Sequence, residues 1–307
     1  MKKTRQILFV VICCCISLCN IKAQQEKSDE FSFVFMTDIH LEPGLGAIDG
    51  FQMAIDTANK LNADFVLTGG DLISDALAAN QGRADSLYTL YGETIKKFEV
   101  PVYNTIGNHE LFGIYRESGV DSTHPDYNDG MYKKYLGDTY YSFDHKGWHF
   151  IVLNSIADGG NSNYIGFVDD EQIEWLKNDL EQIDTTTPIV LSTHIPFVTT
   201  FNQFRKGSLA PNDEGLVVSN SMQILTMLYK YNIKLVLQGH LHIIEYINVQ
   251  NKIQFLVGGA VSARWWKGPN LGMEEGFMLI SIKGEEISWD YIDYGWEAIN
   301  MNSYEKE

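Results

Sequence analysis

The stretch FSFVFMTDIH, residues 31–40, joins a β-rich apolar run to an aspartate and a histidine that lie two positions apart. Such a run predicts a buried β-strand, and its polar end marks the turn that follows. A helix over 51–61, a strand over 64–68, a helix over 81–98 and a strand over 100–106 come next. Because strands alternate with helices, the sequence predicts βαβ units and a largely parallel sheet.

The rest of the chain continues this pattern and then changes to strands alone. Its predicted elements are a hairpin of 140–143 with 149–153, a helix over 169–180 before a strand over 189–191, a helix over 219–229 before a strand over 234–237, and consecutive strands from about 243 to 292. Two stretches, 112–137 and 199–215, lack periodicity, and loops of this length in a compact domain are usually functional. No repeat or linker interrupts the chain, so we expect one domain over 31–300.

Residues 1–23 have the layout of a secretory signal peptide. A basic head is followed by an apolar stretch and by a small residue, Ala23, at a possible cleavage point. The stretch is shorter than the ~20 residues that span a bilayer. We therefore expect export to the periplasm or the cell exterior, with 24–30 as a short lead; a lipoprotein anchor at Cys19 is the alternative, disfavoured by the bulky Leu18. All the cysteines lie in this segment: Cys13, Cys14, Cys15 and Cys19.

Composition and charge limit the class of function. The hydrophobic fraction of 45% and the aromatic fraction of 12% are typical of a globular enzyme. The net charge is −17, and without the basic signal segment the chain is more acidic still. An acidic protein repels nucleic-acid phosphates unless basic residues cluster, and no such cluster is visible. A small phosphorylated substrate is therefore favoured over long nucleic acid, and the sequence predicts no particular oligomeric state.

Each successive strand end delivers side chains that can bind a metal. They are Asp38 and His40, Asp71, Asn108 and His109, His194, and finally His240 and His242. The last pair alone is compatible with a surface loop, although on an extended chain both imidazoles would point to one face. Ligands collect outside the carboxyl ends of parallel strands, so we expect these groups to converge at one edge of the sheet.

The chemistry of this set is that of a two-metal site. Imidazole and carboxylate suit Zn, Fe or Mn, and seven ligands are too many for one tetrahedral ion. A carboxylate can bridge two ions, and Asp71 stands midway in the order. Two ions about 3.5–4 Å apart can hold a bridging hydroxide and stabilise both the entering and the leaving oxygen of a phosphoryl transfer.

In residue type and in order, these five motifs resemble the calcineurin-like metallophosphoesterase family over about residues 31–245. The resemblance implies an α/β fold, a four-layer α/β/β/α sandwich of two mixed β-sheets flanked by helices, with residues 243–292 in the second sheet. It also implies the following roles: Asp38, His40 and His242 on the first metal, Asn108, His194 and His240 on the second, Asp71 bridging, and His109 facing the phosphate as a catalytic residue.

The function implied is that of a secreted phosphoesterase with two divalent or trivalent metal ions, Mn, Fe or Zn. It would hydrolyse a phosphomonoester or phosphodiester by attack of a metal-bridging hydroxide. The alternatives are a non-catalytic scaffold of the same fold and a hydrolase of lipid or cell-surface phosphate. A scaffold would be expected to lose His109 or a bridging ligand, and this chain keeps both.

The chain departs from some branches of the family at Ser74. Phosphoprotein phosphatases carry an acid there, and purple acid phosphatases carry a tyrosine and lack the histidine at the His40 position. Because the acid is absent, we expect Asp75 to take its place as the partner that orients His109. The pattern resembles the branch that acts on cyclic nucleotides and other small phosphodiesters.

Substrate contacts are predicted from aromatic and basic residues outside the motifs. In ARWWKGP, residues 263–269, adjacent tryptophans on an extended chain point to opposite sides, so one would be core and the other exposed. Arg264, Trp265 and Trp266 are therefore candidates for contacting a base or sugar ring. Arg116 and Arg205, from the two irregular stretches, are candidate phosphate contacts.

Overall fold

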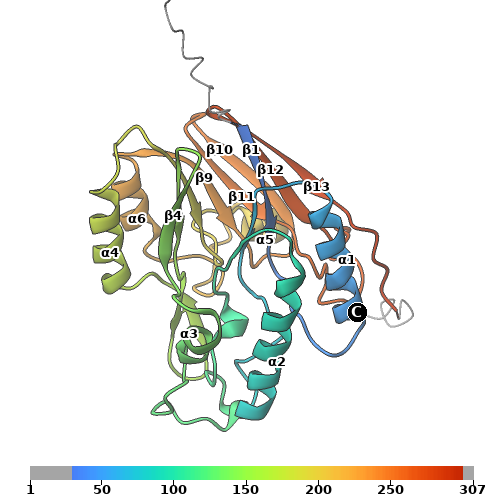
Figure 1. The fold of residues 1–307 in the computed structure, drawn as a ribbon. Coiled ribbons are helices and arrows are strands. Elements are labelled where there is room, and N and C mark those ends of the chain that lie inside the picture. The colour runs from blue at the N-terminus through green and yellow to red at the C-terminus, as the bar shows by residue number, and fades with distance from the viewer. Residues whose placement is uncertain (1–29, 300–307) are drawn as a thin grey trace, which may run out of the picture.

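Residues 30–299 are described by the computed structural model, and their strands form two main β-sheets that pack between helices (Figure 1). The predicted signal peptide, the four cysteines and most of the short lead lie outside the described residues. The two mixed sheets flanked by helices confirm the predicted fold class.

The first sheet has five strands in the order β13-β12-β1-β2-β3. Their bounds are Glu286–Ile292, Phe277–Lys283, Glu30–Met36, Phe65–Thr68 and Val102–Tyr103. β1, β2 and β3 run parallel, as the alternation of strands and helices predicted. The connections between them are α1 (Ala47–Asn59) and α2 (Gln81–Thr94), the latter followed by η1 (Ile95–Lys97), and both α-helices flank one side of the molecule (Figure 1).

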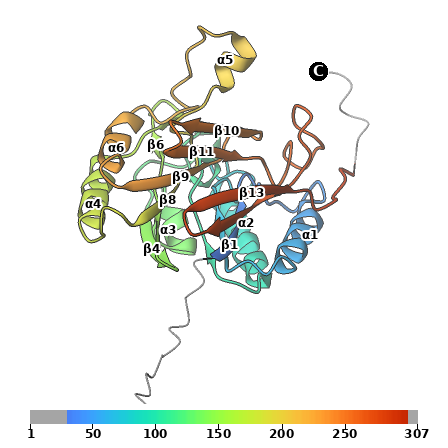
Figure 2. The same cartoon turned by 90° about the horizontal axis from the view of Figure 1, so that it is seen from above.

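The second sheet has six strands in the order β10-β11-β9-β8-β5-β4. Their bounds are Ile244–Val249, Ile253–Gly258, Asn232–Gln238, Pro188–Ser192, Trp148–Val152 and Tyr141–His145. The four inner strands are parallel and the two outer ones antiparallel, which makes the sheet mixed. α4 (Asp170–Leu180) and α6 (Ser221–Leu228) cover the side of the molecule opposite α1 and α2 (Figure 2).

β1 is buried on both faces because it lies in the centre of its sheet. Phe33 and Phe35 face the second sheet, while Val34 and Met36 belong to the core on the helix side. The Phe33 ring meets Phe150 of β5 edge-on, with 5.5 Å between centroids. This double burial explains why residues 31–36 read as a nearly continuous apolar run.

The C-terminal strands divide between the two sheets, so the expectation that all of 243–292 joins the second sheet is wrong. β10 and β11 join the second sheet, whereas β12 and β13 join the first beside β1. The reason is that β1 has an unpaired edge opposite β2. Pairing β12 there satisfies that edge and buries Met278 and Ile280 between the sheets.

The remaining elements lie in the connections. η2 (Asn108–Glu110), η3 (Arg116–Ser118) and α3 (Gly130–Leu136) follow β3, the short hairpin of β6 (Ile156–Asp158) and β7 (Tyr164–Gly166) follows β5, and α5 (Phe201–Lys206) follows β8. α5 projects from the body of the molecule (Figure 2). No helix among residues 30–299 combines the length and apolar character needed to cross a bilayer.

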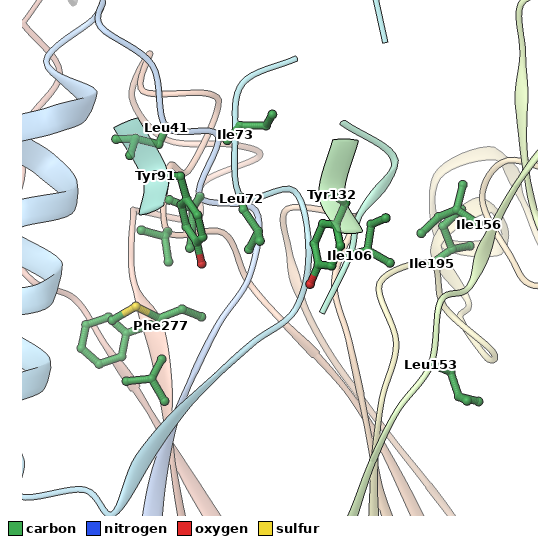
Figure 3. Close-up of a cluster of buried hydrophobic side chains, with 14 of the residues drawn as sticks. Leu41, Leu72, Ile73, Tyr91, Ile106, Tyr132, Leu153, Ile156, Ile195 and Phe277 are labelled. Atoms are coloured by element: carbon green, nitrogen blue, oxygen red, sulfur yellow. The ribbon is translucent and has the colours of Figure 1, made fainter. Parts of the chain in front are cut away.

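The hydrophobic core on the helix side reaches the loops that carry the predicted ligands (Figure 3). Three buried residues of this core directly follow a predicted ligand in the chain: Leu41, Leu72 and Ile195. A close-packed apolar anchor one residue away restricts the position of each ligand. The core therefore fixes the loops from which the site is built.

Candidate metal centre

The seven predicted ligands and His109 converge at one edge of the two sheets, as expected from the strand order. Apart from Asn108, which lies against His194, their donor atoms form three overlapping groups, each with its atoms within 4.8 Å of one another. The groups are Asp38 with His40 and His242, Asp71 with His194 and His240, and His40 with Asp71 and His109. Thus the first sheet supplies the aspartates and the second sheet supplies His194, His240 and His242.

In the first group, two imidazole nitrogens face the same carboxylate. His242 Nε2 lies 3.3 Å from Asp38 Oδ1 and 3.0 Å from His40 Nε2. His242 Nδ1 donates to the carbonyl of Ala263 at 2.6 Å, so its Nε2 keeps a lone pair toward the group. An outer carbonyl that fixes the tautomer in this way is typical of a metal-binding histidine.

The second group repeats the arrangement around Asp71. His194 Nε2 lies 3.2 Å from Asp71 Oδ2 and 3.1 Å from Asn108 Oδ1, while His194 Nδ1 donates to the Gly69 carbonyl at 2.8 Å. His240 Nδ1 is 3.3 Å from His194 Nε2. Asp71 Oδ2 is also 3.6 Å from His40 Nε2. Asp71 is therefore the carboxylate between the two groups.

These residues fit a pair of metal ions on the chemistry of their donors. The Nδ1 protons of His194 and His242 are bound by backbone carbonyls, so the Nε2 atom of each ring has a lone pair. In His194 this lone pair faces Oδ2 of Asp71, and in His242 it faces Nε2 of His40. Lone pairs that face one another at about 3 Å repel unless a proton or a cation lies between them. A cation in each group would satisfy all of these donors.

Charges within the cluster set the protonation states. Burial by itself would raise the pKa of Asp71, but the imidazoles of His194 and His109 outweigh it and hold that pKa well below its ordinary value. Burial by itself would lower the pKa of His194, yet the Asp71 charge raises it to about 9. Burial and the charge of His194 lower the pKa of His240 to about 4. At pH 7 Asp71 is thus ionised and His240 neutral, whereas the raised pKa of His194 means that a bound cation would displace its Nε2 proton.

Most of the ligands occupy the left-handed region of the backbone. Asp38, His40, Asp71, His240 and His242 have φ between 47° and 73°. Residues other than glycine adopt this region at a cost, and such strain gathers at functional sites. It also shows that residues 240–242 are not extended: His240 and His242 lie in different groups because the chain turns between them.

The glycines beside the ligands serve mainly for close packing. A Cβ on Gly107 would lie 2.1 Å from the backbone nitrogen of Asp71, and one on Gly239 would lie 2.1 Å from Thr37 Oγ1. Four glycines lie just before predicted ligands: Gly69, Gly70, Gly107 and Gly239. Of these, only Gly70 has a positive φ.

Glu110 connects two of the ligand loops from behind. Its carboxylate is fully buried and accepts hydrogen bonds from the backbone N–H groups of Gly107, Asp71, Leu72 and Ile73, at 2.7–3.0 Å. It does not belong to any of the three donor groups. Glu110 therefore positions Asp71 and Asn108.

His109 lies beside the metal centre with a carbonyl behind it. Its Nδ1 is 2.6 Å from the Ser74 carbonyl oxygen but 3.9 Å from Asp75 Oδ1, beyond hydrogen-bond range. Asp75 instead accepts from the backbone N–H of Leu77 at 2.9 Å. The prediction that Asp75 orients His109 is thus wrong, because the backbone at Ser74 already occupies that nitrogen. His109 Nε2 is left facing the cluster, 3.9 Å from Asp71 Oδ2.

The two tryptophans separate as predicted, one into the core and one into the open. Trp265 is 43% exposed, and its ring lies 4.4 Å from that of His242 and 5.8 Å from that of His40. Trp266 is buried, and its Nε1 donates to the carbonyl of Ile39 at 2.9 Å. Trp266 is therefore no substrate contact, because its ring fills the space beside α1 and Trp296.

The three predicted arginines lie on different elements and differ in their exposure to solvent. Arg264 directly precedes Trp265 and is partly buried. Arg116 is exposed in η3, and its backbone N–H donates to Ser162 Oγ in the β6–β7 hairpin. Arg205 is exposed on the projecting α5, where its guanidinium lies 5.3 Å from the centre of the Phe201 ring. The position of α5 does not favour Arg205 as a phosphate contact.

Away from the metal centre, the predicted hairpin of 140–143 with 149–153 favours a surface position for His149, but this side chain is buried. It is only 4% exposed, and its two ring nitrogens lie 2.7 Å from Asp144 and 2.9 Å from Asp179. α4, which carries Asp179, covers this part of β5 and so explains the burial. Periodicity within the hairpin could not reveal a partner that lies 30 residues away.

Two sheets flanked by helices, with imidazole and carboxylate donors gathered at the strand ends, define an α/β sandwich with a candidate metal centre at its sheet edge. The chain belongs to the calcineurin-like phosphoesterase family, whose model matches residues 31–243. It is 27% identical to a probable purple acid phosphatase 20 of Arabidopsis thaliana over 80% of this chain and 56% of that protein. It is also 27% identical to a probable cyclic nucleotide phosphodiesterase of Moraxella catarrhalis, over 53% of this chain and 57% of that one.

A solved structure shows the same fold. A dimetal phosphatase from Danio rerio superposes with a TM-score of 0.58 at 14% identity, covering 86% of this chain and 99% of that one. The chain thus spans only about half the length of the curated relatives named above, but nearly all of this structural neighbour.

Proposed function

We propose that this chain is an exported phosphoesterase that hydrolyses a small phosphomonoester or phosphodiester at a two-metal centre. The observation that carries the proposal is the convergence of six donor side chains and His109 into three overlapping groups, with Asn108 beside His194. Family membership supports the class of reaction. Export rests on the signal-peptide pattern of residues 1–23.

The ligands divide between two ions as the donor groups do. Asp38, His40 and His242 would hold one ion, Asn108, His194 and His240 the other, and Asp71 would be shared. The ions, Mn, Fe or Zn by the softness of these donors, would polarise the phosphoryl group and activate water for attack on phosphorus.

His109 is the proposed acid of the reaction. Its Nδ1 proton is held by the Ser74 carbonyl, so in the protonated imidazole Nε2 carries the second proton toward the cluster. From there it can stabilise a phosphoryl oxygen or protonate the leaving oxygen. Its side chain is a quarter exposed, which keeps it in reach of a bound substrate.

Trp265 and Arg264 are the proposed contacts for the part of the substrate beyond the phosphate. Trp265 packs on the ring of His242 and leaves much of its surface open, so a flat ring could stack beside the metal centre. A nucleotide would offer such a ring.

Trp265→Ala should raise KM for a nucleotide and leave KM for an alkyl phosphate nearly unchanged, as steady-state kinetics would show.

The serine at position 74 and the histidine at position 40 set this chain apart from the purple acid phosphatase pattern among its relatives. Ser74 takes the place of the metal-binding tyrosine, and His40 lies in the first donor group. We therefore infer that this chain hydrolyses small phosphodiesters in preference to phosphomonoesters. Comparison of rates on bis(4-nitrophenyl) phosphate and 4-nitrophenyl phosphate tests this preference.

The reaction class is tested by hydrolysis of an aryl phosphodiester and an aryl monoester with Mn²⁺ added. Release of nitrophenol from either supports the proposal. A protein shown by elemental analysis to hold two metals, yet inactive on both esters and in a screen of nucleotides, sugar phosphates and phospholipids, would instead be a scaffold. A rate found only in the presence of detergent-dispersed phospholipid would favour a lipid phosphate hydrolase.

A further inference from the structure

The β6–β7 hairpin places one side chain beside the metal centre that the proposed ligand set does not use. Tyr164, the first residue of β7, stands edge-on to the imidazole of His240, with 6.2 Å between ring centres and an angle of 89°. No motif marks this tyrosine, because the hairpin does not follow one of the strand ends from which the ligands come.

The hairpin is tied to the ligand loops at its base. Ser155, just before β6, accepts hydrogen bonds through Oγ from the backbone N–H groups of His194 at 3.2 Å and Ile195 at 2.9 Å. The N–H of Gly166 donates to the carbonyl of Glu214 at 2.7 Å. The position of Tyr164 is thus fixed relative to His194.

The hydroxyl of Tyr164 has its hydrogen-bonding capacity free. Within the described range 30–299, it has no hydrogen-bond partner, although the ring is partly buried. A phenol keeps its proton at neutral pH, so this hydroxyl can donate a hydrogen bond. A hydroxyl donor on a ring that stands beside the predicted ligand His240 can meet an acceptor bound at the metal centre.

We propose that Tyr164 binds the substrate directly, its phenol O–H donating a hydrogen bond to a non-bridging oxygen of the phosphoryl group at the metal centre. This inference rests on the proposed function, since it assumes that phosphate is bound there. A hydrogen bond to a charged oxygen corresponds to roughly 10- to 100-fold in affinity.

The test compares Tyr164→Phe with Tyr127→Phe in metal-loaded protein. Tyr127 is the matched control because its hydroxyl donates to Asp158, the residue that pairs with Tyr164 across the hairpin, at 2.8 Å. Tyr164→Phe should keep both metals, weaken binding of inorganic phosphate by roughly 10- to 100-fold in calorimetry, and lower kcat/KM by a similar factor on aryl esters. Tyr127→Phe should leave all three quantities near wild type.

The inference is overturned if Tyr164→Phe binds phosphate as wild type does, if it loses metal, or if Tyr127→Phe shows the same loss. The last result would mean that the placement of the hairpin matters and the hydroxyl does not. Calorimetry measures phosphate binding without turnover. A wild-type protein that binds phosphate but hydrolyses no ester would therefore contradict the proposed function, while the comparison of phosphate binding would still test the role of Tyr164.

Discussion

His109 separates the chemistry of the site from the binding of its metals. The residue lies beside Asp71 but belongs to neither ligand set of the proposed ions. His109→Ala should lower the rate by ~10²–10⁴-fold, the usual size of acid–base catalysis, and keep two metals per chain. Kinetics with elemental analysis measures both quantities, and loss of metal in this variant contradicts the assignment. Asp75→Asn is the control, which should stay close to wild type because Asp75 makes no hydrogen bond to His109.

Asp71 is the residue on which both metals depend. Its Oδ2 lies 3.2 Å from His194 Nε2 and 3.6 Å from His40 Nε2, so it contacts both donor groups. Asp71→Ala should therefore abolish binding of both metals. His242→Ala should weaken the binding of only one metal, because His242 belongs only to the group of Asp38 and His40. Titration calorimetry with Mn²⁺ distinguishes the two; a full site retained in Asp71→Ala refutes the bridging role.

At the scale of elements, Glu110 holds the loop after β2 to the loop after β3. Glu110→Ala would leave four buried N–H groups without a partner, each at about 1–3 kcal/mol. We expect a loss of more than about 4 kcal/mol in the free energy of unfolding, which is exceptional for one substitution. Urea denaturation measures it, with exposed Glu117→Ala as a control that should change little.

His149 joins the second sheet to α4 and makes stability depend on pH. Burial lowers the pKa of His149, but its hydrogen bonds to Asp179 and Asp144 outweigh burial and raise it. A raised pKa means that the protonated pair stabilises the fold fully below about pH 6.5, the unfolded value. That stability is lost as the pH rises through the higher folded value. Urea midpoints from pH 5.5 to 8.5 should fall in wild type, and this slope should become shallower in His149→Gln.

At the scale of the whole molecule, the metal centre joins the two sheets. Asp38 and Asp71 follow strands of the first sheet, whereas His194 and His240 follow strands of the second. Each ion bound only by the folded protein at 100 times Kd adds about 2.7 kcal/mol of stability. Removing both ions with a chelator should therefore lower Tm by roughly 10–20 °C.

Scanning calorimetry with and without chelator measures this shift. His109→Ala should show the same shift as wild type, because it keeps the ligands. An unchanged Tm in protein known to have been metal-loaded would mean that the sheets are held by their apolar core alone.

The order of the ligands could be predicted from the sequence because each follows its own apolar strand. Asp38 after β1 and His240 after β9 needed only the strand pattern and the rule that sites form at strand ends. Their backbone geometry could not be predicted in this way. An i and i+2 pair suggested an extended chain, whereas tertiary packing holds both histidines at positive φ.

The amino-acid sequence by itself determined the strand–helix alternation, the family and the set of donor side chains, since these depend on residue type and local spacing. Only the tertiary structure decided that β12 and β13 complete the first sheet, that Ser74 holds His109, and that Tyr164 stands beside His240. Each of these depends on a contact between residues far apart in the chain. At His109, the contact is with the backbone carbonyl of Ser74 and not with the side chain of Asp75. Such contacts are settled by packing and hydrogen bonding of the whole fold, which leave no periodic trace in the sequence.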